Sequence, residues 1–256
     1  MAAMSGAETS SVDDLRQEVE RLRAALAEQE AQAANKEDQL QRYAADLRET
    51  FKEERARAQE LRDSYFATVR ALTNAVEARD AYTGKHAERV AAYALEIGTA
   101  VGERWSGSAE IEFGFLLHDI GKVAIPDSIL HKPEPLTTQE RELIQQHPVI
   151  GWEIVRQVDF LGAASDVVRH HHERWDGDGY PDGLKGEKIP LTARVFAVAD
   201  TLDALTTTRP YRPASPIEDA RALIHEARAT QFDPTVVDAF ADMPDEVFER
   251  IRAEIG

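Results

Sequence analysis

The sequence predicts an all-α protein in which a long N-terminal coiled-coil helix precedes a helical domain. Apolar residues repeat at alternating steps of four and three over positions 12–66, which is the heptad pattern of a coiled coil. Beyond this segment they recur with the spacing of amphipathic helices. The chain contains no convincing run of alternating strand residues and no Asn-Gly hairpin turn. Its 256 residues are enough for one good-sized domain and a smaller element.

The segment 12–66 is rich in Ala, Glu, Arg and Gln and contains neither Pro nor Gly. Its apolar stripe consists of Leu15, Val19, Leu22, Leu26, Ala33, Leu40, Tyr43, Leu47 and Leu61. Polar residues fall on the same stripe at Gln29, Lys36, Thr50, Glu54 and Arg57. Such residues weaken a coiled coil while fixing its register. We therefore expect a parallel homodimer here, the alternative being a solvated or partly disordered charged helix. Residues 1–11 are expected to be disordered.

Residues 67–256 are expected to form the helical domain, and all eight histidines lie in it. The apolar positions that suggest helices are Phe66, Val69, Leu72, Val76, Val90, Tyr93, Ala94, Ile97, Val167, Val168, Val195, Phe196, Val198, Leu223 and Ile224. Three Pro- and Gly-containing stretches, "KPEPLT", "DGDGYPDGLKGEKIP" and "TRPYRPASP", mark long loops between helices.

Composition excludes several classes of protein. The net charge of −17 opposes binding to duplex DNA or RNA, which requires a basic surface. The absence of cysteine excludes disulfides and thiolate metal sites. No apolar stretch approaches the ~20 residues that span a bilayer, and the N-terminus lacks the basic and apolar regions of a signal peptide. We therefore expect a cytoplasmic protein that does not associate with membranes.

An apolar run, Phe115-Leu116-Leu117, leads directly into His118 and Asp119. A buried imidazole and carboxylate are costly unless they are paired or bind a metal, so this pair faces either solvent or a cation. On adjacent helical residues the two side chains diverge by about 100°, so one metal can bind His118 while Asp119 spans two. Two metals ~3.5–4 Å apart, bridged by a hydroxide, form a common clamp for phosphoryl displacement.

A lone histidine is more often structural than a ligand. In this domain, however, several apolar runs end in His or Asp, and imidazole with carboxylate suits Fe, Mn or Zn.

The segments "HDIGK" and "HHERWDGDGYPDGLKGEKIP" resemble the HD-GYP family, a branch of the HD metal-dependent phosphohydrolases. The resemblance covers about residues 69–241 and includes "RDAYTGKHAERV", "HPVIGWEIV", "ADTLDALTTTRPYR" and "QFDPTVVDAF" in the same order. It implies a helical HD-domain fold and hydrolysis of cyclic di-GMP. The heptad segment lies outside it.

The resemblance also implies a set of metal ligands. One metal would be held by His86, His118, Asp119 and Asp200, and the other by Asp119, His147, His171 and His172, with Asp119 bridging. His131, His170 and His225 match no ligand position and are expected to be structural. Glu173 is expected to bond to a ligand histidine or to shape its loop.

Three further residues match positions that would meet the substrate. Lys122, one turn beyond His118, corresponds to a lysine that faces the phosphate and supports catalysis together with Asp119; alternatively it is a solvated lysine at a helix end. Arg209 corresponds to a contact with phosphate or guanine, for which the planar guanidinium is suited. Tyr180, in the loop Gly179-Tyr180-Pro181, would line the pocket, or alternatively would pack against the core.

We therefore expect a phosphodiesterase that cleaves cyclic di-GMP to pGpG, and possibly to GMP, through a hydroxide activated by two ions, Fe or Mn. Some family members have Glu at the position of Tyr82 and can hold a third metal. A tyrosine is a poor metal ligand at neutral pH, so we expect two metal ions per chain. The alternatives are an HD hydrolase of another cyclic dinucleotide, or a weakly catalytic adaptor that binds a cyclic dinucleotide or a diguanylate cyclase.

Overall fold

The computed structural model describes residues 5–79, 85–105, 107–162, 164–208 and 213–255, with side chains from residue 12 onward. Among these residues the only extended pairing is one isolated bridge between Arg228 and Phe232, so the predicted all-α class is confirmed. The α-helices are α1 (Ser5–Glu77), α2 (His86–Ala100), α3 (Ala109–Leu116), α4 (Asp127–Leu130), α5 (Thr138–Ile144), α6 (His147–Val155), α7 (Ala164–His170), α8 (Leu191–Thr206), α9 (Ile217–Glu226), α10 (Pro234–Ala241) and α11 (Asp245–Ile255). The 3₁₀ helices are η1 (Ile120–Ala124), η2 (Asp159–Leu161) and η3 (Gly186–Lys188).

Helix α1 is longer at both ends than the sequence predicted. It begins at Ser5, inside the segment 1–11 that we expected to be disordered, and it continues past residue 66 to Glu77. Strong helix formers and the lack of Pro or Gly beyond Gly6 account for this length. The chain divides into two compact units between Asp63 and Ser64.

In the first unit the heptad stripe is exposed. Leu15, Leu22 and Leu40 retain 64%, 59% and 67% of their accessible surface. The remaining surface carries ion pairs one helical turn apart, such as Asp38 with Arg42 at 2.7 Å. Such exposed pairs contribute little stability. Within the described ranges, no helix combines the length and the apolar character that crossing a bilayer requires.

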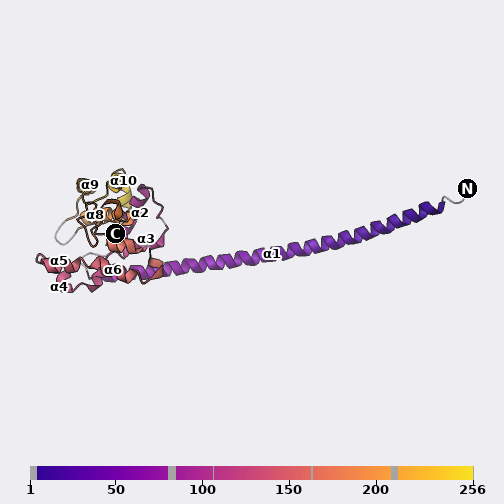
Figure 1. The fold of residues 1–256 in the computed structure, drawn as a ribbon, viewed down its shortest axis with the longest axis horizontal. Coiled ribbons are helices and arrows are strands. Elements are labelled where there is room, and N and C mark those ends of the chain that lie inside the picture. The colour runs from indigo at the N-terminus through magenta and orange to yellow at the C-terminus, as the bar shows by residue number, and fades with distance from the viewer. Residues whose placement is uncertain (1–4, 80–84, 106, 163, 209–212, 256) are drawn as a thin grey trace. The chain divides into compact units, whose positions relative to one another are not determined.

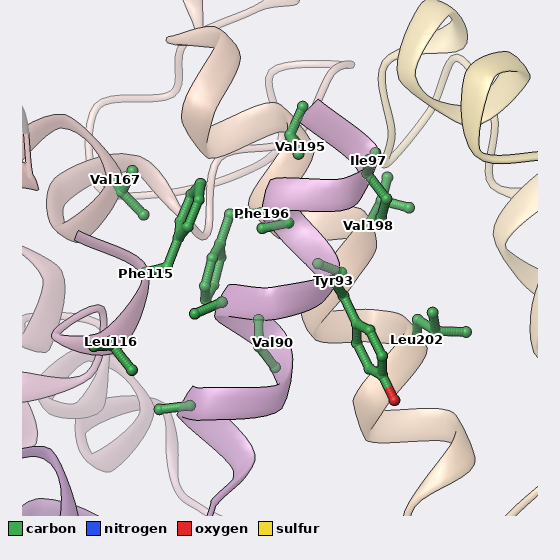
Figure 2. Packing of buried hydrophobic residues seen from close by; sticks show 14 of the residues in the cluster. Val90, Tyr93, Ile97, Phe115, Leu116, Val167, Val195, Phe196, Val198 and Leu202 are labelled. Atoms are coloured by element: carbon green, nitrogen blue, oxygen red, sulfur yellow. The ribbon is translucent and has the colours of Figure 1, made fainter. Parts of the chain in front are cut away.

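The second unit has one hydrophobic core, and α2 lies at its centre. This helix contacts α3, α8, α10 and α11. Figure 1 shows α2 among α3, α8 and α10. The apolar face predicted for it, Val90, Tyr93, Ala94 and Ile97, is fully buried. Figure 2 shows three of these side chains beside residues of α3 and α8, including Phe196. The core thus fixes α2, α3 and α8 against one another. The candidate site lies where α2 begins and α3 ends, beside α8.

Two residues that the helical spacing assigned to apolar faces are not buried. Leu72 in α1 and Leu223 in α9 retain 51% and 50% of their surface. Spacing predicts which residues share a helix face, but only packing decides how wide a strip of that face is covered.

The segment around His118 also differs from the prediction. Phe115, Leu116 and Leu117 are buried, as expected. However, α3 ends at Leu116, so His118 and Asp119 lie in a turn before η1 and not on adjacent positions of an α-helix. The divergence of their side chains is therefore set by this turn.

The turn is held in place by a close approach between η1 and α6. A Cβ atom on Gly121 would overlap the carbonyl oxygen of His147 and lie 2.6 Å from the amide nitrogen of Gly151. Only glycine allows two backbones to approach so closely. Gly121 therefore brings the His118–Asp119 turn next to the first residue of α6.

We expect Gly121→Ala to destabilise the protein by about 3 kcal/mol, because the new methyl group must push η1 and α6 apart. Gly162→Ala is the matched control, since a Cβ there would meet its nearest atom, the Asp159 carbonyl oxygen, at 3.8 Å. Urea unfolding of both variants measures the difference, and equal stabilities would contradict the packing argument.

Candidate metal centre

Three histidines of the site lie just beyond helix ends. His118 follows the end of α3, His147 follows the end of α5, and His171 follows the end of α7. The last carbonyl groups of a helix have no partner within the helix. Each of these imidazoles bonds through Nδ1 to the carbonyl three residues earlier, at Nδ1–O distances of 2.9, 2.8 and 3.0 Å respectively. The helix ends thus fix the rings and leave each Nε2 facing the centre.

His86, the first residue of α2, is held differently. Its Nδ1 lies 2.7 Å from Oδ2 of the buried Asp203, and its Nε2 lies 3.4 Å from Oδ1 of Asp200. Asp203 also accepts two hydrogen bonds from Arg89, at 2.7 and 3.1 Å. Burial alone would lower the pKa of His86, but the two carboxylates outweigh it and raise that pKa to about 10. In the metal-free chain the His86 ring is therefore protonated, and metal binding would displace that proton.

The two carboxylate oxygens of Asp119 face different histidines. Its Oδ1 lies 3.2 Å from Nε2 of His147 and 3.8 Å from Nε2 of His171. Its Oδ2 lies 3.1 Å from Nε2 of His118 and 2.8 Å from Nζ of Lys122. Burial raises the pKa of Asp119, but Lys122 and the histidines more than offset this, and the pKa lies well below its usual value. Asp119 is therefore ionised and lies between His118 on one side and the pair His147 and His171 on the other.

The arrangement of these donors fits a cation. The Nε2 atoms of His147 and His171 are 3.2 Å apart, and the Nδ1 of each already donates to a carbonyl. In this tautomer both Nε2 atoms carry lone pairs, which point at each other and at a carboxylate oxygen. Burial, followed by the neighbouring histidines, holds the pKa of His171 well below its usual value, so this ring is neutral. A divalent metal would fit between these donors, because neutral imidazole and ionised carboxylate are the forms that bind it.

The expected ligands come together to different degrees. Asp119, His147, His171 and His172 offer donor atoms that all lie within 4.8 Å of one another. The other expected set is more open: it consists of the pair His86–Asp200 and the pair His118–Asp119, with the His86 and His118 ring centres 5.7 Å apart. Burial and His147 lower the pKa of His172 to about 4, so this ring is neutral as well.

Two of the expected substrate residues lie at this centre. The Tyr180 ring stacks on His172, with centroids 4.7 Å apart and planes 28° apart. Gly179 makes this possible, because a Cβ there would overlap the backbone of Arg174. Lys122 contacts Asp119, as described above. Arg209 and Tyr82 fall outside the described residues.

The remaining polar residues of these motifs have other roles. Glu173 accepts hydrogen bonds from the amides of Asp182 and Leu184, at 2.8 and 2.9 Å, so it shapes its loop. His170 contacts the Asp182 carboxylate at 3.1 Å, and His131 contacts the Asp127 carbonyl at 3.2 Å, so both have structural partners.

Sequence reasoning missed Arg89 and Asp203 as parts of the site. Asp203 follows Asp200 by three residues, and Arg89 follows His86 by three residues. On a helix this spacing places each pair on one face. That signal was present, but only the packing of α2 against α8 shows that the two faces meet.

Comparison with known proteins gives a consistent result. A family model described as HD domain matches residues 70–236. A cyclic di-GMP phosphodiesterase of Thermotoga maritima is 39% identical over 197 residues, covering 76% of this chain and 54% of that protein. A 3′3′-cGAMP-specific phosphodiesterase of Vibrio cholerae is 39% identical over 198 residues, covering 77% of this chain and 38% of that protein. The chain thus spans about half or less of the length of these relatives.

Among solved structures, a cyclic GMP-AMP-specific phosphodiesterase of V. cholerae superposes with a TM-score of 0.53 at 21% identity. The match covers 72% of this chain and 52% of that one. At this identity the likeness concerns the fold.

We expect Asp203→Asn to lower the affinity for Mn²⁺ by ~10–100-fold, the usual effect of removing a partner that orients a metal-binding histidine. The amide can accept from Arg89 or from His86, but its NH₂ group cannot accept from the other. Asp238→Asn is the matched control, because Asp238 makes a similar two-bond pair with Arg228 on the surface. Titration calorimetry measures both, and equal affinities would show that Asp203 does not orient His86.

Proposed function

The chain belongs to the HD domain family, and we propose that it is a metal-dependent phosphodiesterase that hydrolyses cyclic di-GMP. The resemblance to the HD-GYP branch noted in the sequence is confirmed by relatives that are 39% and 43% identical to this chain. The substrate proposal draws on the name of the T. maritima relative. It also draws on the site, because a dense group of imidazoles around an ionised carboxylate is suited to metal-assisted hydrolysis of a phosphodiester.

The observation that carries the proposal is the position of Asp119. One of its oxygens faces His118 and the other faces His147 and His171, which supports a bridging carboxylate between two divalent ions. Oxygen and nitrogen ligands without sulfur suit Fe or Mn. We propose that His86, His118, Asp119 and Asp200 hold one ion and that Asp119, His147, His171 and His172 hold the other.

The reaction adds water across one P–O bond of the cyclic dinucleotide, so that the 3′ oxygen leaves and linear pGpG is formed; a second cleavage would give GMP. When bound, the ions lower the pKa of water and offset the charge that develops on the phosphate. Lys122 would bind a phosphate oxygen, because its ammonium lies at the edge of the centre. Tyr180 would present its ring to the substrate beside His172.

A second candidate substrate is cyclic GMP-AMP. The V. cholerae relative named for it is as similar to this chain, at 39% identity, as the T. maritima relative named for cyclic di-GMP. Both substrates have the same phosphodiester, so the metal centre does not distinguish them. A panel of both dinucleotides under one metal-loading condition does.

The full chain, loaded anaerobically with Fe²⁺ or with Mn²⁺, is expected to hold two ions and to convert cyclic di-GMP to pGpG. Asp119→Ala is expected to lose metal and activity together, since it removes the ligand shared by both ions. Lys122→Ala should keep the metal and lose turnover. Elemental analysis and chromatography of the products measure these outcomes. A metal-loaded wild-type chain that cleaves neither dinucleotide contradicts the proposed activity, and three well-occupied ions contradict the proposed number.

We also propose that the chain forms a parallel homodimer through α1. The exposed stripe with heptad spacing supports this, because a single helix in water leaves Leu22, Leu40 and Leu47 unburied. Pairing two such stripes removes this apolar surface from water. The interruptions by polar residues reduce the affinity but not the preference for one register.

Leu22→Asp combined with Leu47→Asp is expected to convert the dimer to a monomer, because each change places a charge in the seam. Ala24→Asp combined with Ala45→Asp is the control, since these residues lie on the opposite side of the same heptads. Sedimentation equilibrium distinguishes the two states. A dimer that survives the seam substitutions would place the interface elsewhere.

A further inference from the structure

The end of α1 supplies a cap for α2, the helix that begins with the expected ligand His86. The residue before α2, Lys85, has φ of 78° and provides no side-chain cap. The carboxylate of Glu77, which is 8% exposed, fills this role from another helix. It accepts hydrogen bonds from the backbone amides of Lys85 and Ala87, at 3.2 and 2.7 Å. His86 thus lies between two amides that are bonded to the last residue of α1.

A second side chain beyond the end of α1 holds η1, which follows the His118–Asp119 turn. The Arg79 guanidinium donates to three backbone carbonyls, those of Val123 at 2.8 Å, Ile125 at 3.0 Å and Lys122 at 3.3 Å. It also pairs with the Asp127 carboxylate at 2.7 Å. A planar group with several fixed donors is suited to holding consecutive carbonyls in one conformation.

A third contact reaches the end of α3. The buried hydroxyl of Thr73 donates to the carbonyl of Leu116 at 3.2 Å. The pocket on this side of the centre is lined by Thr73, Val76 and Glu77 from α1, together with His86, His118 and Asp119. The end of α1 is therefore a wall of the centre itself.

We propose that Glu77 and Arg79 are positioning residues of the metal centre: Glu77 sets the place of His86, and Arg79 sets the place of Lys122 and the turn that carries Asp119. This inference rests on the proposed metal site. It extends that site to residues that bind neither metal nor substrate. Its consequence is that a displacement of the last turns of α1 moves two ligand-bearing segments at once.

The first arm of the test uses Glu77→Gln in the full chain. The amide can accept one of the two backbone N–H bonds but not both, so the first turn of α2 loosens. We expect Mn²⁺ affinity to fall ~10–100-fold, as for other groups that orient ligands. Hydrogen exchange of the metal-free protein should show faster exchange at Ala87, with unchanged protection in α8. Glu60→Gln, at an exposed position of the same helix, is the control.

The second arm uses Arg79→Lys, which retains the charge but not the fork of donors. We expect faster exchange at Lys122–Ile125, near-normal metal content, and a lower kcat for the cyclic dinucleotide. Arg55→Lys, also exposed on α1, is the control.

The two readouts separate the possible failures. If the wild-type chain binds no Mn²⁺, the proposed function fails, while hydrogen exchange still reports on Glu77 and Arg79. If the wild type binds Mn²⁺ and both variants match their controls in exchange, affinity and kcat, the positioning role is wrong. A Glu77→Gln chain that loses protection throughout α8 would also overturn it, because Glu77 would then support the whole fold.

Discussion

The site depends on one constraint: each metal-binding imidazole must keep its proton on one ring nitrogen so that the other nitrogen presents its lone pair to the metal, and a hydrogen bond from the protonated nitrogen fixes this tautomer and the ring orientation. In this fold the bonds come mainly from the ends of helices. α3, α5 and α7 finish close together, and each directs a carbonyl of its last turn to the Nδ1 of a following histidine. The carbonyl would otherwise lack a partner, and the ring would otherwise be free to rotate. The same bond therefore terminates a helix and orients a ligand.

Bringing several helix ends to one point requires close backbone packing, and it also concentrates charge. Gly121 provides the packing between η1 and α6. The charge is balanced in the metal-free chain by groups that metal binding would affect. The protonated ring of His86 lies between Asp200 and Asp203, and Lys122 lies against Asp119. Arg89 bonds to both oxygens of Asp203, including the one that faces His86, and together with His86 it holds the pKa of that carboxyl below its usual value. Because a guanidinium does not lose its proton in proteins, the charge of Arg89 stays when the His86 proton leaves.

Much of this arrangement was predictable from sequence, but the limits have a physical basis. Heptad spacing predicted α1, and helical spacing predicted the buried face of α2, because periodicity reports which residues share a face. Residue identity suggested the histidines and aspartates of the centre. The turn at His118 was not predictable from spacing, because it results from the contact of Gly121 with α6. Nor were the contacts of Asp203 and Arg79, since each depends on a segment distant in sequence, nor that of Glu77, which depends on how the chain turns between α1 and α2. The exposure of Leu72 and Leu223 was not predictable either, because only packing decides how much of a helix face is covered.

The choice of substrate must lie in residues other than the expected metal ligands. In the proposed mechanism, two ions and a lysine would interact with a phosphodiester, which cyclic di-GMP and cyclic GMP-AMP have in common. Relatives named for these two dinucleotides are equally similar to this chain. Discrimination between guanine and adenine requires hydrogen bonds to groups on the base edge, because stacking on an aromatic ring accepts either base. Tyr180, which stacks on His172, would therefore contribute affinity but little selectivity. In the proposed mechanism, the discriminating donors and acceptors would therefore belong to side chains other than Tyr180 and the expected metal ligands.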